Sequence, residues 1–194
     1  MHGRPVLEYL VDRMRVVEPD ELRLVTRPDK ADLVAHARRA RLTLVLGEPA
    51  SAAASIALAA EGLDQDDVVL IGFPDTVWSP VDGYARLLPQ LAEADVVLGV
   101  FEGTSDEQLR RSDVVVLEGD RVTRIDVKSN RPGSQLIWGA AVARRWALAG
   151  LEQHVHPGQL FDEQARVGRR VIGVRLPGTF LDVGTPESLE AAQS

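Results

Sequence analysis

The sequence predicts an α/β fold in which a largely parallel sheet is covered by helices on both faces. Hydrophobic residues switch between helical spacing and short extended runs, and strand and helix alternate four times in the first half of the chain. Short connections between such elements are typical of parallel strands joined by right-handed crossovers. With 194 residues, 45% hydrophobic and 26% charged, the chain can bury a sizeable core. We therefore expect a single domain over residues 1–194.

The first half supplies the alternation. Val6, Leu7, Leu10, Val11 and Met14 lie on one helical face after Pro5, which suits a first helical turn. Val68 to Gly72 is apolar throughout, which predicts a strand buried on both faces. The other expected elements are strands at Leu22 to Thr26, Arg41 to Leu46 and Asp95 to Phe101, and helices at Pro28 to Arg39, Ala52 to Ala60 and Pro80 to about Ala92.

The second half predicts antiparallel additions to this sheet. Gly119-Asp120 lies between two extended runs, which is a hairpin signal. We expect strands at Val114 to Glu118, Arg121 to Val127, Leu136 to Val142 and Val171 to Leu176, and helices at Ala143 to Leu151, Gln159 to Arg166 and Pro186 to Ala192.

Charge and composition exclude several classes of function. The net charge of -7 counts against a nucleic-acid binder, because it repels a phosphate backbone. The absence of Cys excludes disulfides, thiolate zinc sites and a cysteine nucleophile. No apolar run has the length of a membrane span, and the N-terminus lacks the pattern of a signal peptide. We expect a cytoplasmic protein with small-molecule partners.

Two aspartates are the first candidates for chemistry. Asp75 follows the strand Val68 to Gly72, and Asp182 ends an apolar stretch before Thr185-Pro186, which opens a helix. Ligands of open parallel sheets bind at the carboxyl ends of strands, and a hard cation such as Mg²⁺ prefers carboxylates there. The alternative for Asp75, at about even odds, is a turn cap.

Other polar features give weaker signals. Lys128, one of two lysines in an Arg-rich chain, suits a point-charge contact to a phosphate, although a solvated strand end is favoured by about two to one. Gly139 in an apolar strand indicates close approach of a ligand or a backbone. His154 and His156 are expected in a solvated loop.

Several segments resemble the sugar nucleotidyltransferases, especially the glucose-1-phosphate thymidylyl- and uridylyltransferases. Gly3 to Leu10 is similar to the family's "G-[KR]-P-[ML]-[IL]-x-[YH]-x-[LV]" start, Pro74-Asp75 to its "[GP]-D" metal motif, and Asp126-Val-Lys128 to its "E-x-K" motif. Phe180 to Leu189 resembles the closing "W-x-D-[IV]-G-T-P-E-x-[LY]", with Phe180 in place of Trp.

The resemblance implies a Rossmann-like, three-layer αβα (GT-A-like) fold with a mixed sheet, and a transfer from dTTP or UTP to a sugar-1-phosphate. It implies that Asp75 and Asp182 hold Mg²⁺, that Lys128 contacts the sugar phosphate, and that Asp126 and the backbone of Gly139 contact sugar hydroxyls. Leu46 to Ala53 lies where the family binds the nucleotide base, with Glu48 and Ala52 as the expected contacts. The Gln and the second Gly of the family's base motif are not in place.

The resemblance also implies an upstream strand and a glycine-rich triphosphate loop, which the family places before the segment at Gly3. Two expectations compete: a normal enzyme whose start is assigned too late, and a shortened, catalytically inactive relative that binds sugar nucleotide or regulates. Without that strand, Leu22 to Thr26 and Val68 to Gly72 are either separated by a gap or newly paired. A homo-oligomer in which a second copy lends a strand is a further alternative.

Overall fold

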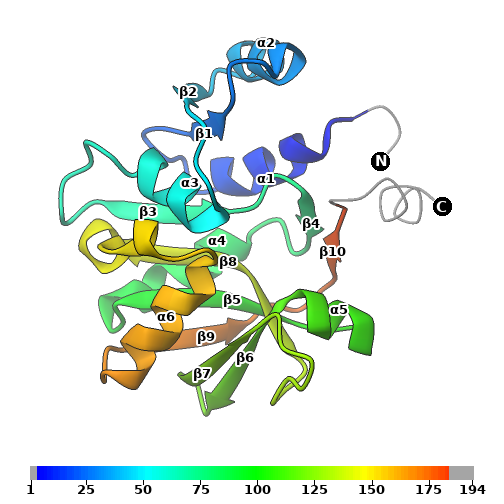
Figure 1. Ribbon diagram of the computed structural model, residues 1–194, viewed down its shortest axis with the longest axis vertical. Helices are drawn as coiled ribbons and strands as arrows, with labels where there is room; N and C mark the ends of the chain where they lie inside the picture. The colour runs from blue at the N-terminus through cyan, green and yellow to red at the C-terminus, as the bar shows by residue number, and fades with distance from the viewer. Residues whose placement is uncertain (1–3, 184–194) are drawn as a thin grey trace.

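A six-stranded mixed sheet forms the centre of this computed structural model, which describes residues 4–183 (Figure 1). Its order is β3-β8-β5-β9-β7-β6, and its strands are β3 (Val68–Gly72), β5 (Val96–Glu102), β6 (Asp113–Glu118), β7 (Arg121–Val127), β8 (Leu136–Arg144) and β9 (Val171–Arg175). β5 and β9 are parallel, whereas β8 is antiparallel to both of its neighbours β3 and β5. The central strands β5 and β8 are almost entirely buried, because both of their faces are covered.

Helices cover the two faces of this sheet and define two hydrophobic clusters. One face packs against α3 (Ala52–Ala59) and α6 (Pro157–Arg166), through residues such as Ile56 and Phe161. The other face packs against α1 (Val6–Arg15), α4 (Gly83–Leu87), the 3-10 helix η1 (Leu88–Ala92) and α5 (Asp106–Arg111), with Tyr84 and Leu87 fully buried. The predicted α/β fold with three layers and a mixed sheet is therefore confirmed. The sheet is not largely parallel, however, because β5 and β9 form its one parallel pair within residues 4–183.

A separate two-stranded ladder contains the earliest strands. β1 (Arg23–Thr26) and β2 (Thr43–Leu46) are parallel, are connected by α2 (Ala31–Arg39), and lie at the top of Figure 1. Within residues 4–183, β1 pairs only with β2 and β3 pairs only with β8. Of the two expected arrangements, the structure therefore has the one in which these two strands are not paired with each other.

Three predicted details are wrong. β3 is not buried on both faces, because it is the edge strand of the large sheet, and Val68 is 42% exposed. The helix predicted at Ala143 to Leu151 is replaced by the end of β8 and by the 3-10 helices η2 (Arg145–Leu148) and η3 (Leu151–Gln153), since Ala143 pairs with both β3 and β5. The helix predicted at Pro80 to Ala92 begins only at Gly83 and continues as a 3-10 helix from Leu88.

Three short elements were not predicted. They are α5, β4 (Thr76–Trp78) and β10 (Phe180–Asp182). The predicted helix at Pro186 to Ala192 lies outside the described residues. None of the helices within residues 4–183 is long and apolar enough to cross a membrane.

Candidate functional site

A tight turn after β3 positions Asp75. Both the backbone N–H and the hydroxyl of Thr76 donate to the carbonyl of Phe73, at 3.2 and 2.8 Å, and so close the turn that leads into β4. Pro74 and Asp75 form the exposed part of this turn. Asp75 therefore lies at the carboxyl end of β3, as its place in the sequence predicts.

The pairing of β4 with β10 brings Asp182 to the same place. The two strands are antiparallel, with Asp182 opposite Thr76, and the N–H of Val183 donates to the carbonyl of Asp75 at 2.9 Å. Although Asp75 is exposed as a residue, partial desolvation of its carboxyl raises the pKa of that group, its own backbone N–H lowers the pKa, and the charge of Asp182 raises it again. The carboxylates of Asp75 and Asp182, which are 107 positions apart in the sequence, thus act on each other electrostatically.

Packing on Gly139 holds β10 against the large sheet. A Cβ atom at Gly139 would lie 2.1 Å from the ring of Phe180, so only glycine lets this ring approach β8. The Phe180 ring also contacts that of Phe101, with centroids 5.3 Å apart, and Gln108 Nε2 donates to the Phe180 carbonyl at 3.1 Å. The predicted close approach at Gly139 is present, and among the described residues the group that approaches is the aromatic side chain of Phe180 and not a backbone.

An interruption in strand pairing marks the site on the large sheet. β3 and β6 both run antiparallel to β8: the β3 pairs end at Gly72 opposite Ala140, and the β6 pairs begin at Val114 opposite Ile137. Trp138 and Gly139 lie between these two sets of pairs. At this interruption the chain leaves the edge of β8 in the turn that bears Asp75. A later segment, β6, meets the same edge of β8 and begins at Asp113.

Lys128 lies beside the same interruption. It follows β7, adopts a left-handed backbone with φ of 44°, and donates its N–H to the Ser112 carbonyl at 3.2 Å. Its exposed side chain acts on Asp113, because its positive charge lowers the pKa of that carboxyl. Lys128 is thereby fixed at the start of β6.

The remaining predicted residues have local partners or lie elsewhere. The Asp126 carboxylate accepts hydrogen bonds from Arg124 Nε and the Gly133 N–H, both at 2.7 Å, so it braces the loop after β7. Glu48 and Ala52 are exposed and follow β2, where Ser51 caps α3. Glu48 lies in the loop after β2 and Ala52 begins α3, and within residues 4–183 the β1–β2 ladder shares no strand pairing with the large sheet.

Two residues at the interruption, Asp113 and the nearby His156, were not predicted as functional. Burial raises the pKa of Asp113, while the nearby charges of His156 and then Lys128 lower it. The two histidines lie in the loop before α6, as expected, but the side chain of His154 is only 15% exposed and faces Glu163 at 3.6 Å. A usable signal existed for Asp113, because it directly precedes the predicted hairpin strand Val114 to Glu118.

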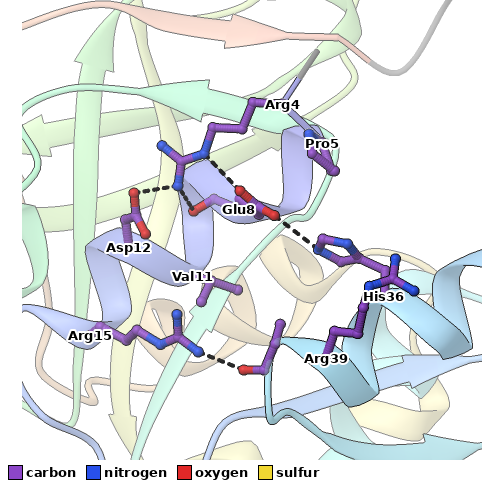
Figure 2. A pocket seen from close by; sticks show the side chains of 9 residues that line it. Arg4, Pro5, Glu8, Val11, Asp12, Arg15, His36 and Arg39 are labelled. Carbon is purple, nitrogen blue, oxygen red and sulfur yellow. Dashed lines mark hydrogen bonds and ion pairs between the residues drawn. The ribbon is translucent and has the colours of Figure 1, made fainter.

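A cavity of about 380 Å³ lies between α1 and α2 (Figure 2). Its charged side chains largely pair with one another: Arg4 contacts Glu8 at 2.9 Å and Asp12 at 2.5 Å, and His36 Nε2 faces Glu8 at 3.4 Å. None of the residues predicted for catalysis lines this cavity. These contacts join α1 to α2, and we do not include the cavity in the candidate site.

A comparison with protein families identifies one match over most of the chain. Residues 1–167 match the family described as MobA-like NTP transferase domain, and the chain belongs to that family of nucleotidyltransferases. The predicted resemblance is therefore confirmed at the level of the family. No match was found among curated proteins.

Solved structures share the fold. One from Bacillus anthracis, assigned as a glucose-1-phosphate thymidylyltransferase and solved with sucrose, has a TM-score of 0.81 at 14% identity and covers 97% of this chain and 80% of its own. The UDP-glucose pyrophosphorylase from Acinetobacter baumanii has a TM-score of 0.75 at 14% identity and covers 97% and 81%. HddC from Yersinia pseudotuberculosis has 0.72 at 15%, covering 98% and 84%.

Proposed function

We propose that this chain transfers a nucleotidyl group from an NTP to a sugar-1-phosphate. The observation that carries the proposal is the meeting of Asp75 and Asp182 at the carboxyl end of β3, in a domain of an NTP transferase family. Juxtaposed carboxylates repel each other, and a divalent cation removes that repulsion. The site therefore has a chemical reason to bind a cation together with phosphate oxygens.

The donor set fits Mg²⁺. Carboxylate oxygens are the protein ligands that this ion prefers, and it usually takes only one or two of them, with substrate phosphates and water completing its shell. Asp75 and Asp182 would be the two protein ligands, since they come together where β4 pairs with β10. Bound there, Mg²⁺ would supply neutralisation of phosphate charge.

In the proposed reaction, an oxygen of the sugar phosphate attacks the α-phosphorus of the NTP. A new P–O bond forms, the bond from the α-phosphorus to the bridging oxygen of the β-phosphate breaks, and pyrophosphate leaves with that electron pair. This chemistry needs positioning and charge neutralisation and no covalent intermediate. Lys128, fixed by its hydrogen bond to Ser112, is suited to orient the anionic sugar phosphate.

We further propose dTTP or UTP as the nucleotide and the cytoplasm as the location. The support for the base is indirect: two of the structures with this fold are named for thymidylyl and UDP-glucose chemistry. Glu48, in the loop after β2, and Ala52, at the start of α3, remain the proposed contacts to the base. A cytoplasmic enzyme would meet all of these substrates as small molecules.

The decisive measurement is pyrophosphate release with each NTP and glucose 1-phosphate, with and without Mg²⁺. We expect dTTP or UTP to support turnover and Asp75→Asn and Asp182→Asn each to reduce it by about 100-fold or more, the usual scale for loss of a group that stabilises transition-state charge. Asp82→Asn is a matched control, because Asp82 is an exposed aspartate that pairs with Arg86.

A second result would favour the non-catalytic alternative. If sugar nucleotide raises the melting temperature while no pyrophosphate forms, the chain is a binding or regulatory module. The same assay should then be made on a version that includes about 20 further residues of upstream coding sequence, roughly a strand and a phosphate loop. Absence of turnover from both proteins with every NTP would overturn the enzymatic proposal.

A further inference from the structure

Asp113 lies beside the candidate site, at the point where β6 joins the large sheet. It is the first residue of β6 and pairs with Val127, the residue before Lys128. Because Val114 lies opposite Ile137 in an antiparallel ladder, Asp113 comes next in register to Trp138, within the interruption between β3 and β6. Asp113 is therefore on the same edge of β8 as the turn that bears Asp75.

The groups around this half-buried carboxylate are positive or are hydrogen-bond donors. His156 and Lys128 both act on it electrostatically. Its Oδ2 lies over the first turn of α6, so close that a Cβ at Gly158 would be 2.5 Å away. The N-terminal turn of a helix favours negative charge. Asp113 is thus the negative centre of a small polar cluster, of which the proposed reaction uses only Lys128.

Trp138 connects this cluster to the turn that bears Asp75. The residue is 5% exposed, and its side chain acts on Asp113 as a hydrogen-bond partner, which lowers the pKa of that carboxyl. The Trp138 ring also contacts the ring of Phe73, with centroids 5.3 Å apart, at the base of the turn that carries Asp75. Trp138 therefore contacts both the Asp113 carboxyl and the turn of the candidate site.

We propose that Asp113 is a specificity-determining residue, which makes the acceptor site favour sugar phosphates bearing hydroxyl or ammonium groups and disfavour those with a second anionic group. The inference rests on the proposed function, since it names the class of acceptor for that same site. Lys128 would take the phosphate that all acceptors share. Asp113 would accept hydrogen bonds from the rest of the sugar.

The physical basis is the charge of a partly buried carboxylate. Such a group accepts hydrogen bonds from hydroxyls and ammonium groups, and both kinds of hydrogen bond stabilise the bound ligand. A second phosphate at the same place would meet a like charge in a region that solvent screens poorly. The nearby positive charges of His156 and Lys128 reduce this repulsion, but Lys128 is proposed to be occupied by the phosphate that all acceptors share.

The test measures equilibrium binding and so does not depend on turnover. Calorimetric titrations would use glucose 1-phosphate, glucosamine 1-phosphate and glucose 1,6-bisphosphate with the wild type, with Asp113→Asn and with Asp120→Asn. Asp120 is an exposed aspartate in the turn at the far end of the same hairpin, so its substitution changes the net charge equally. A Lys128→Ala variant checks that all three ligands use this site.

We expect the wild type and Asp120→Asn to bind the two monophosphates about tenfold or more tightly than the bisphosphate, and Asp113→Asn to remove most of that preference. Glucosamine 1-phosphate should lose the most affinity in Asp113→Asn. An unchanged ranking in Asp113→Asn would overturn the proposal, and if the wild type still releases pyrophosphate, the proposed function stands. Should none of the three sugar phosphates bind the wild type, the proposal for Asp113 fails, and pyrophosphate release decides the proposed function separately.

Discussion

The ring of Phe180 decides which residue can occupy position 139. Sequence analysis expected something to approach Gly139 closely, because a glycine weakens the interior of a strand and commonly marks a point of close packing. It could not identify Phe180 as that group, since the contact depends on β10 folding back beside β4. The meeting of Asp75 and Asp182 has the same origin. That both end apolar segments was visible in the sequence, but two three-residue strands leave no periodic pattern from which their pairing could be predicted.

We predict that Gly139→Ala destabilises the fold by about 1–3 kcal/mol, the usual range for overpacking a core. The new methyl would overlap the Phe180 ring, which has little room to move because it also packs on Phe101. Chemical denaturation would measure this change in the wild type and in a Phe180→Leu background. The smaller Leu side chain should absorb part of the overlap, so equal penalties in the two backgrounds would show that the overlap with Phe180 is not the cause.

A second residue-scale prediction concerns Asp113 and pH. Its folded-state pKa is raised above the ordinary value of 3.8, so between these two values the folded state binds more protons than the unfolded state. Stability contributed by this group is therefore lost as pH rises through that window. Asp113→Asn should raise the melting temperature relative to the wild type by about 1–3 °C near pH 7, and by less near pH 3.5. A difference that is larger at the acidic pH would show that the sign is wrong.

At the scale of the element, the sequence predicted most strands of the large sheet but not their neighbours. β3 has the bounds predicted for it, Val68 to Gly72, yet it lies at an edge of the sheet. An apolar run indicates that a strand is buried, but it does not indicate which other strands lie beside it. Here β8, which comes later in the chain, pairs with only one edge of β3. The helix expected after Val142 failed for a related reason. Ala143 suits either structure, and its pairing partners lie more than 40 positions away in the chain.

The edge position of β3 can be tested with matched substitutions. Val68 is 42% exposed, whereas Val97 in β5 is fully buried between β8 and β9. Val→Thr keeps the β-branched shape and adds a hydroxyl group. We expect Val68→Thr to change the free energy of unfolding by less than about 0.5 kcal/mol, and Val97→Thr to lower it by about 1–3 kcal/mol. Comparable losses from the two variants would indicate that the outer edge of β3 is covered in solution.

A helix cap gives a second prediction at this scale. Ser51 Oγ accepts a hydrogen bond from the Ala54 N–H at 3.0 Å and donates one to the His154 carbonyl at 2.9 Å, so it both caps α3 and ties it to the segment before α6. Ser51→Ala should lower the free energy of unfolding by about 1–2 kcal/mol, as measured by urea denaturation. Ser51→Thr retains the hydroxyl and should recover most of the loss. Equal losses from both would exclude the hydrogen bonds as the cause.

For the whole molecule, α1 connects the two parts of the framework. Leu7 and Val11 pack into the cluster formed with β1, β2 and α2, whereas Leu10 packs into the cluster beneath the large sheet, next to Gly72. The sequence showed only that these residues share one helical face. That this face is divided between two clusters follows from the separation of β1 from β3, which no local pattern could indicate.

This division predicts unequal stability across the molecule. The β1–β2 ladder is parallel, has only two strands and rests on a small cluster, so its amides should exchange with solvent sooner than those of β5 and β8. Leu7→Ala removes a side chain from that small cluster alone. In hydrogen exchange followed by mass spectrometry, it should increase exchange in residues 23–46 and leave β5 and β8 nearly unchanged. Leu98→Ala, in the core of the large sheet, is the matched control and should increase exchange throughout, because loss of a buried leucine weakens global stability by about 2–5 kcal/mol. A uniform increase in Leu7→Ala would mean that the two parts unfold together and that their separate strand pairing does not divide the molecule energetically.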